Sequence, residues 1–194
     1  MKKIGLSLIA LMLIFTVACK QKEKKEESVD KEATTEVKEE VKQEAKKVKV
    51  SMGSESDSNV SGNVVFKEEN GMVTMTAVFD GLNPGTHAIH LHEKADCSAH
   101  DGTSANGHWN PTNEKHGKWG SPDGYHKGDI GNFEADENGN GAVTFETDEW
   151  CIGCGDANKD ILNRAVIVHQ GGDDFTSQPS GDAGARVSCG EVVM

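Results

Sequence analysis

The sequence predicts an all-β domain, an antiparallel sandwich or barrel, from two observations. The clearer one is a period-2 alternation, in which Val73, Met75, Ala77 and Phe79 are separated by Thr74, Thr76 and Val78. The other is that several short apolar runs follow, with Gly-rich and Asn-rich turns between them and no long amphipathic helical stretch after residue 50. Short strands joined by such turns are typical of antiparallel sandwiches and barrels.

The expected strands can be placed in order along the chain. Glu69-Asn70-Gly71 is a hairpin turn signal between the first two strands, and Asn138-Gly139-Asn140-Gly141 marks another turn further on. The runs that we expect to form strands are 62–66, 73–79, 87–92, 130–133, 142–145, 165–169 and 186–193.

Two long stretches interrupt this even spacing, residues 93–129 and residues 170–185. Loops of such length in a compact domain are usually functional. Each begins immediately after a histidine that ends an expected strand, which favours a functional role.

The amino-terminal residues 1–18 are typical of a signal peptide, because Lys2-Lys3 precede a short apolar run. That run is shorter than the roughly 20 apolar residues that a membrane span needs. Thr16-Val17-Ala18-Cys19 resembles a bacterial lipoprotein box, in which the cysteine carries the lipid; the alternative is a plain signal peptide with an incidental cysteine. We therefore expect an extracytoplasmic protein of the cell envelope, attached to a membrane only through lipid on Cys19.

Charge divides the rest of the chain into two parts. Residues 19–49 combine the lipidated cysteine with a run of Lys and Glu that has no Gly, Pro or aromatic residue, which is typical of a solvated tether. Residues 50–194, the expected folded domain, carry eight basic and 23 acidic side chains, a net charge of −15. Such a domain repels nucleic acid, so we exclude nucleic acid as a partner.

Histidine is concentrated in the middle of the chain. Seven of the eight histidines lie within residues 87–126, and the eighth, His169, ends an apolar run. His90 and His92 are two apart on an expected strand, so both side chains leave the same face, while the intervening apolar residues face the core. Because imidazole is the commonest metal ligand, this pattern predicts a metal site.

The order of motifs around these histidines resembles the copper/zinc superoxide dismutase family over roughly residues 50 to 194. The resemblance implies a Greek-key antiparallel β-sandwich or barrel of about eight strands with two long functional loops. The matching segments are His90-Leu91-His92, Gly107-His108-Trp109-Asn110-Pro111, Lys115-His116-Gly117, His126-Lys127-Gly128-Asp129-Ile130-Gly131-Asn132, Val168-His169, Asp173-Asp174 and Gly184-Ala185-Arg186-Val187-Ser188-Cys189-Gly190.

The resemblance also implies two metal cofactors, copper and zinc, which share the imidazole of His108. The implied copper ligands are His90, His92, His108 and His169. The implied zinc ligands are His108, His116, His126 and Asp129, a nitrogen-and-carboxylate set that suits tetrahedral zinc. Asp173 is the implied carboxylate that links His90 to His116 and orients both rings.

The activity implied by the resemblance is that of an enzyme, a superoxide dismutase, which disproportionates superoxide anion to dioxygen and hydrogen peroxide. The copper would cycle between two oxidation states, zinc would be structural, and His108 would supply a proton. Arg186 is the implied guanidinium beside the copper and binds no metal, which favours catalysis. The alternative is an envelope lipoprotein that sequesters copper and zinc through the same ligands without significant catalysis.

The remaining cysteines and basic residues complete the expectations. The resemblance pairs Cys97 with Cys189 in a disulfide. Cys151 and Cys154 depart from the family pattern; a local disulfide is favoured over a copper site, and a thioredoxin-like redox pair lacks the βαβ context. We interpret His87 as a hydrogen-bonded structural residue, His100 as a surface loop residue and Lys127 as solvated surface.

Overall fold

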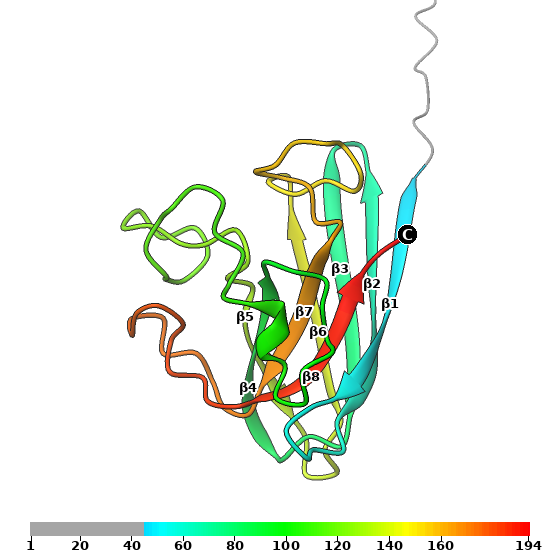
Figure 1. Ribbon diagram of the computed structural model, residues 1–194, viewed down its shortest axis with the longest axis vertical. Helices are drawn as coiled ribbons and strands as arrows, with labels where there is room; N and C mark the ends of the chain where they lie inside the picture. The colour runs from blue at the N-terminus through cyan, green and yellow to red at the C-terminus, as the bar shows by residue number, and fades with distance from the viewer. Residues whose placement is uncertain (1–44) are drawn as a thin grey trace, which may run out of the picture. The chain divides into compact units, whose positions relative to one another are not determined.

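The computed structural model describes residues 45–194, which form a closed barrel of eight strands with one short 3₁₀ turn (Figure 1). The expected signal peptide, Cys19 and most of the expected tether lie outside the described residues. Within the described part, no helix is long and apolar enough to cross a membrane. The strands are β1 Lys46–Ser54, β2 Ser61–Glu69, β3 Met72–Asp80, β4 Gly85–His92, β5 Gly131–Ala135, β6 Gly141–Thr147, β7 Arg164–His169 and β8 Arg186–Val192, and the 3₁₀ turn η1 is Thr103–Ala105.

Every neighbouring pair in the barrel is antiparallel, and the strand order is β1-β2-β3-β6-β5-β4-β7-β8. Strands β4, β5 and β6 follow one another as neighbours, and β7 returns through a long connection to lie beside β4. This arrangement is a Greek key. The predicted all-β Greek-key class is therefore confirmed.

The core is the product of period-2 alternation. On β3, Val73, Met75, Ala77 and Phe79 are at most 2% exposed, while the alternate residues are exposed or half-buried. Inward-facing residues of the other strands meet them inside the barrel, together with Trp150 from the connection between β6 and β7. The alternation that predicts the strands thus also selects the buried side chains.

Strand β1 begins at Lys46, four residues before the expected domain boundary at residue 50. The boundary was wrong because residues 46–49 continue the alternation that leads into Val50 and Met52. Val48 is 3% exposed and pairs with Phe66 of β2, whereas Lys47 and Lys49 face solvent. A Lys-rich composition therefore hid the outward face of a strand.

Both long loops project from the same side of the barrel (Figure 1). Strands β4 and β7 are antiparallel neighbours, with His90 opposite Ile167 and His92 opposite Ala165, so the two loops leave opposite ends of this pair. Residues 93–130 leave the end of β4, and residues 170–185 leave the end of β7. Because neighbouring strands carry the two loops, side chains from both can meet over one face of the barrel.

A second, smaller cluster packs on the outer face of β7 and β8, beneath residues 93–105. Ala105 of η1 packs there with Ala165, Ile167 and Cys189, and Cys97 lies against them. A disulfide joins Cys97 to Cys189 across a sequence separation of 92 residues. The first part of the long loop is thus attached to the barrel by both packing and a covalent bond.

Candidate metal site

Three of the histidines predicted to bind metal are carried by strands. His90 and His92 lie on β4 and His169 ends β7, and each is at most 4% exposed. Ile89 and Leu91 point into the core with no exposed surface. The strand therefore does what its alternation predicts, since one face anchors the backbone while the other presents imidazoles.

His108 joins this group through backbone pairing rather than through a strand of its own. It forms an isolated antiparallel bridge with His92, and the neighbouring Trp109 N–H donates to Leu91 O at 2.8 Å. Gly128 makes the close approach possible, because a Cβ there would lie 2.1 Å from Leu91 O and 3.0 Å from Trp109 N. Loop residues 107–109 and 126–129 are thereby held against β4.

The structure brings seven predicted ligand residues into two groups that share His108. Four potential ligand atoms in each group lie within 4.8 Å of one another, and all of the residues are buried. The first group is His90, His92, His108 and His169; the second is His108, His116, His126 and Asp129.

The ring nitrogens in these groups fit metal binding. Four of them, all in the first group, are buried without a hydrogen-bond partner within residues 45–194: His90 Nδ1, His92 Nε2, His108 Nε2 and His169 Nε2. In the second group, His116 Nδ1 and His126 Nδ1 lie 3.0 and 3.3 Å from carboxylate oxygens of Asp129. A buried polar atom without a partner costs free energy, so the four unpartnered nitrogens of the first group favour binding of a metal ion there. Nitrogen atoms suit copper in the first group, and nitrogen with carboxylate oxygen suits zinc in the second.

His108 faces both groups at once. Its Nδ1 lies 2.8 Å from Asp129 Oδ1, and its Nε2 is the unpartnered atom on the side of His90 and His92. The ring centroids of His90 and His92 lie 4.0 and 5.0 Å from that of His108, while His116 and His126 lie at 5.3 and 5.7 Å. One imidazole can therefore offer a nitrogen to each of two ions.

Asp173 links the two groups from behind. Its Oδ2 lies 2.9 Å from His90 Nε2, and its Oδ1 lies 2.9 Å from His116 Nε2. Both rings are thus fixed through the nitrogen that does not face a metal position. Gly181 has φ 72° and a Cβ there would lie 1.9 Å from Asp173 Oδ1, so only glycine fits against this carboxylate.

Burial and the two carboxylates set the protonation of the rings. Burial lowers the pKa of His108 to about 4 and holds the pKa values of His92 and His169 well below the usual range. Burial also acts to lower the pKa of His116, but its hydrogen bonds to Asp129 and Asp173 outweigh that effect and raise it to about 9. The three rings with lowered pKa values are neutral at physiological pH, the form that binds metal ions.

The two aspartates stay ionised for the opposite reason. Burial would raise the pKa of Asp129, but hydrogen bonds from His108, His116 and His126 outweigh burial and hold it well below its usual range. Asp173 has a lowered pKa as well, because hydrogen bonds with His116 and His90 outweigh its burial. Both groups are carboxylates throughout the physiological range.

Arg186 lies beside the first group because of strand pairing. It is the cross-strand partner of His169, next to a register shift between Val168 and His169. Its Nη1 donates to Gly102 O at 2.6 Å, which fixes one side of the guanidinium and leaves other donors free. Burial lowers the pKa of Arg186, with Asp101 opposing the shift, but a guanidinium stays charged at any physiological pH.

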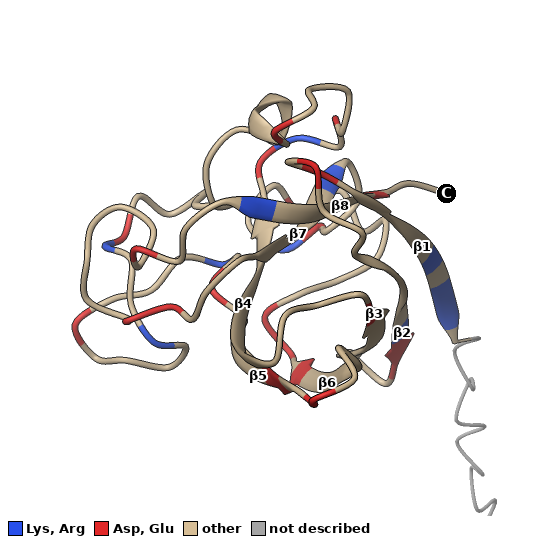
Figure 2. Ribbon diagram, turned by 90° about the horizontal axis from the view of Figure 1, so that it is seen from below, with Lys and Arg blue, Asp and Glu red and all other residues tan. Residues whose placement is uncertain are grey.

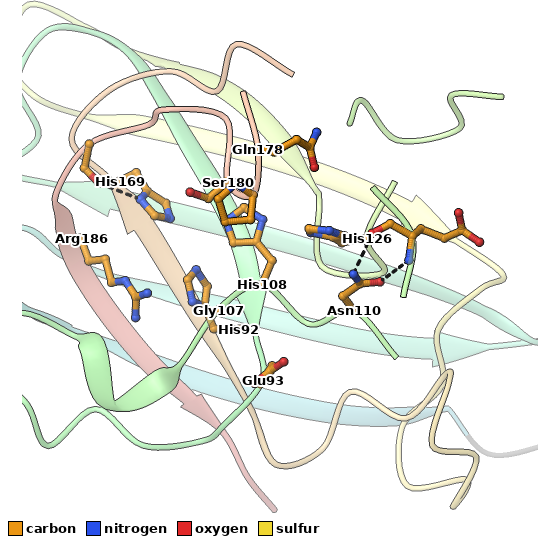
Figure 3. A pocket seen from close by; sticks show the side chains of 13 residues that line it. His92, Glu93, Gly107, His108, Asn110, His126, His169, Gln178, Ser180 and Arg186 are labelled. Carbon is orange, nitrogen blue, oxygen red and sulfur yellow. Dashed lines mark hydrogen bonds between the residues drawn. The ribbon is translucent and has the colours of Figure 1, made fainter. Parts of the chain in front are cut away.

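One pocket with a volume of about 500 Å³ is lined by Arg186 and by four of these histidines, His92, His108, His126 and His169 (Figure 3). In Figure 3, Arg186 and the rings of His92, His108 and His169 lie around the same space. Arg186 is the one Lys or Arg among the lining residues that the structure describes, and two acids, Glu93 and Glu114, also contribute to the lining.

The expectations for His87, His100 and the Cys151–Cys154 pair are confirmed. His87 is buried between two carbonyl oxygens, with Nδ1 2.8 Å from His169 O and Nε2 2.7 Å from Asn83 O. His100 is exposed and pairs with Asp57, and Cys151 forms the favoured local disulfide with Cys154.

The interpretation of Lys127 as solvated surface was wrong. Its side chain is 19% exposed, and its ammonium pairs with Glu149. Sequence reasoning missed Glu149, as it missed the Gly102 carbonyl that holds Arg186, because both pairings join segments that only the fold brings together.

Comparison with known proteins agrees with this geometry. The sequence pattern of the family described as "Copper/zinc superoxide dismutase (SODC)" matches residues 60–192. "Superoxide dismutase [Cu-Zn] 2" of Aquifex aeolicus (strain VF5) is 35% identical over 141 residues, which cover 69% of this chain and 82% of that protein. "Superoxide dismutase [Cu-Zn] 1" of the same organism is 38% identical over 107 residues, covering 54% of this chain and 63% of its relative.

Solved structures share the barrel. A double mutant of a SOD-like protein from Bacillus subtilis has a TM-score of 0.67 and 31% identity, covering 75% of this chain and 97% of that one. The clock protein EA4 has a TM-score of 0.66 and 30% identity, covering 76% of this chain and 93% of that one. With the family pattern matched over more than half of its length, this chain belongs to the copper/zinc superoxide dismutase family.

Proposed function

We propose that this protein disproportionates superoxide, converting two superoxide anions and two protons to dioxygen and hydrogen peroxide. The observation that carries the proposal is the position of Arg186, a cation that ligates no metal, beside an imidazole that serves two metal positions. A site built only to store metal has no need of a guanidinium in its pocket.

The proposed copper ligands are the four residues of the first group: His90, His92, His108 and His169. The proposed zinc ligands are those of the second group: His108, His116, His126 and Asp129. Bound copper would supply the one-electron oxidation and reduction of superoxide, and bound zinc would hold the second group in place without redox change.

The chain itself has three tasks in this reaction. Arg186 attracts and orients the anion with the donors that Gly102 O leaves free. His108 would hold one proton at Nε2 when that nitrogen is not bound to copper and deliver it to the departing peroxide, which would take its second proton from water. Asp173 keeps the rings of His90 and His116 in fixed orientations while this happens.

The test is to measure metal content and dismutase activity of the purified protein before and after copper loading. Activity should rise in proportion to copper bound in the first group. His169→Ala should lose copper more than zinc, because His169 belongs to the first group alone. A copper-loaded protein without dismutase activity would favour the alternative, metal sequestration.

We also propose that the protein is anchored in the cell envelope by lipid on Cys19. The support is the sequence alone: a signal-peptide pattern that ends in Thr16-Val17-Ala18-Cys19. Intact-mass analysis of the mature protein tests this, since a mature amino terminus without lipid would exclude the anchor.

A further inference from the structure

The second group of ligands lies largely on a loop without strands, residues 93–130, so other contacts must hold its ligands in place. His116 is held through its backbone by Gln178, which accepts from His116 N at 3.0 Å and donates to His116 O at 2.9 Å. His126 has no such contact to its own backbone from the second long loop among the described residues. Instead, the residues on either side of it, Tyr125 and Lys127, make contacts with another segment of the chain.

Glu149, in the connection between β6 and β7, ties down both neighbours of His126. Tyr125 Oη donates to Glu149 Oε1 at 2.6 Å, and Lys127 Nζ pairs with Glu149 Oε2. The Lys127 ammonium also lies 5.2 Å from the centroid of the Tyr125 ring, within cation–π range. One carboxylate therefore bridges the residue before this ligand and the residue after it.

Trp150 adds a contact to the backbone at the same place. Its Nε1 donates to Lys127 O at 2.8 Å, and its ring is 1% exposed. The ring packs against Phe66 and Phe145 of the barrel and against Trp119 of the loop, with centroid separations of 6.1, 5.1 and 5.7 Å. A residue of the barrel core thus holds the backbone of Lys127 in place.

The segment that carries Glu149 and Trp150 is itself firmly held. Cys151 follows directly, closes a disulfide with Cys154, and exchanges backbone hydrogen bonds with residues 159 and 161. Ile152 N donates to Glu68 Oε2 of β2 at 2.8 Å. The Cys151–Cys154 disulfide, which departs from the family pattern, therefore helps to hold the segment that carries Glu149 and Trp150. We call these two residues and their contacts with residues 125 and 127 the Glu149–Trp150 support.

We propose that Glu149 and Trp150 are positioning residues that preorganise His126 and Asp129 for zinc. The inference rests on the proposed function, because it takes the second group as the zinc site. A loop held in its binding conformation before the ion arrives loses less conformational freedom on binding, so its affinity is higher. The Glu149–Trp150 support would act on zinc and leave copper in the first group nearly unaffected.

The test uses the metal-free chain and a chromophoric chelator that competes for zinc. Glu149→Ala and Trp150→Phe should each weaken zinc binding by about tenfold, the lower end of the effect seen when groups behind metal ligands are removed. Glu146→Gln, which removes one acidic charge from exposed β6, is the matched control and should stay within about twofold of the parent. Copper binding should change by less than about threefold in all variants.

Cobalt(II) provides a readout that a merely destabilised barrel would not give. Its visible absorption in the zinc position should shift in Glu149→Ala and stay unchanged in Glu146→Gln. Tyr125→Phe removes the hydroxyl that bonds to Glu149 and keeps the ring, so it can replace the larger changes if those prevent folding. It should also lower the affinity for zinc.

The outcomes separate the two proposals. Zinc affinities and cobalt spectra equal to those of the parent in every folded variant would overturn this inference and leave the proposed function intact. A parent chain that binds copper but no zinc would overturn both the zinc assignment and the inference drawn from it.

Discussion

Arg186 is the residue on which the proposal of catalysis, rather than metal storage, depends. It lies opposite His169 and lines the pocket, and the neighbouring Gly102 carbonyl fixes its orientation. Its role therefore depends on both its charge and its planar fork of donors.

Arg186→Ala should lower dismutase activity about 100-fold, comparable to the loss of one preorganised donor at other active sites. Copper and zinc content should stay unchanged, since Arg186 belongs to neither group of ligands. Arg186→Lys should retain part of the activity, because the charge remains and the fork does not. Metal analysis and activity of the same sample check this, with the exposed Lys49→Ala as the control for a lost positive charge. Unchanged activity in Arg186→Ala would remove the main argument for catalysis.

Tyr125 reports on the loop support, because it is the single tyrosine of the chain. Burial, and then its hydrogen bond to Glu149, raise its pKa to about 12. Since the unfolded value is about 10, the neutral phenol stabilises the fold fully below pH ~10, and this contribution is lost as pH rises through about 12.

An absorbance titration of tyrosinate should therefore have a midpoint near pH 12 in the parent. In Glu149→Gln the midpoint should fall, because the charge of the carboxylate no longer opposes ionisation of the phenol. A parent midpoint at the value of free tyrosine would mean that the Tyr125–Glu149 contact does not form in solution.

At the scale of elements, the first part of the long loop depends on the disulfide between Cys97 and Cys189. The bond closes a loop with a sequence separation of 92 residues and lies beside the small cluster under η1. Closing a loop of that length restricts the unfolded chain strongly.

Removal of this bond in a Cys97→Ala, Cys189→Ala double variant should lower the free energy of unfolding by roughly 4–5 kcal/mol. Denaturant unfolding of the metal-free protein is the measurement, because bound metal would add its own stabilisation. The comparison is the parent chain with its disulfides oxidised. A change below about 1 kcal/mol would mean that the unfolded chain is not restricted by the bond.

At the scale of the whole molecule, the net negative charge opposes binding of the proposed substrate, an anion. Acidic side chains are spread over many loops, and basic residues are fewer (Figure 2). Residues 171–184 contain no Lys or Arg, and the pocket lining includes Glu93 and Glu114. In the proposed reaction, a superoxide anion would therefore be repelled at long range and attracted only close to Arg186 and a bound metal.

The catalytic rate should accordingly be flat, or rise, as salt is added. Salt screens distant charges beyond a Debye length of about 10 Å at 0.1 M and so weakens the repulsion from the acidic surface more than the attraction within the pocket. Rates at several ionic strengths, with metal content verified in each, provide the test. A steep fall of the rate with salt would show that attractive steering dominates instead.

Much of the fold follows from local patterns. Alternation on β3, the hairpin turn at residues 69–71 and the histidines that end β4 and β7 are visible in the sequence, because a strand alternates with a period of two residues. Strand β1 was not among the expected strands, because three of its first four residues are lysines. Composition there outweighed a pattern that depends on Val48 facing the core.

The sequence by itself determined the all-β class, the residue types of the predicted ligands and the positions of the two long loops, because these depend on spacing along the chain. Tertiary structure alone decided which atoms meet: that His108 faces both groups, that Arg186 lies opposite His169, and that Glu149 ties down residues 125 and 127. The physical reason is that such contacts join segments brought together by strand pairing and packing, and no local periodicity encodes which segments those are.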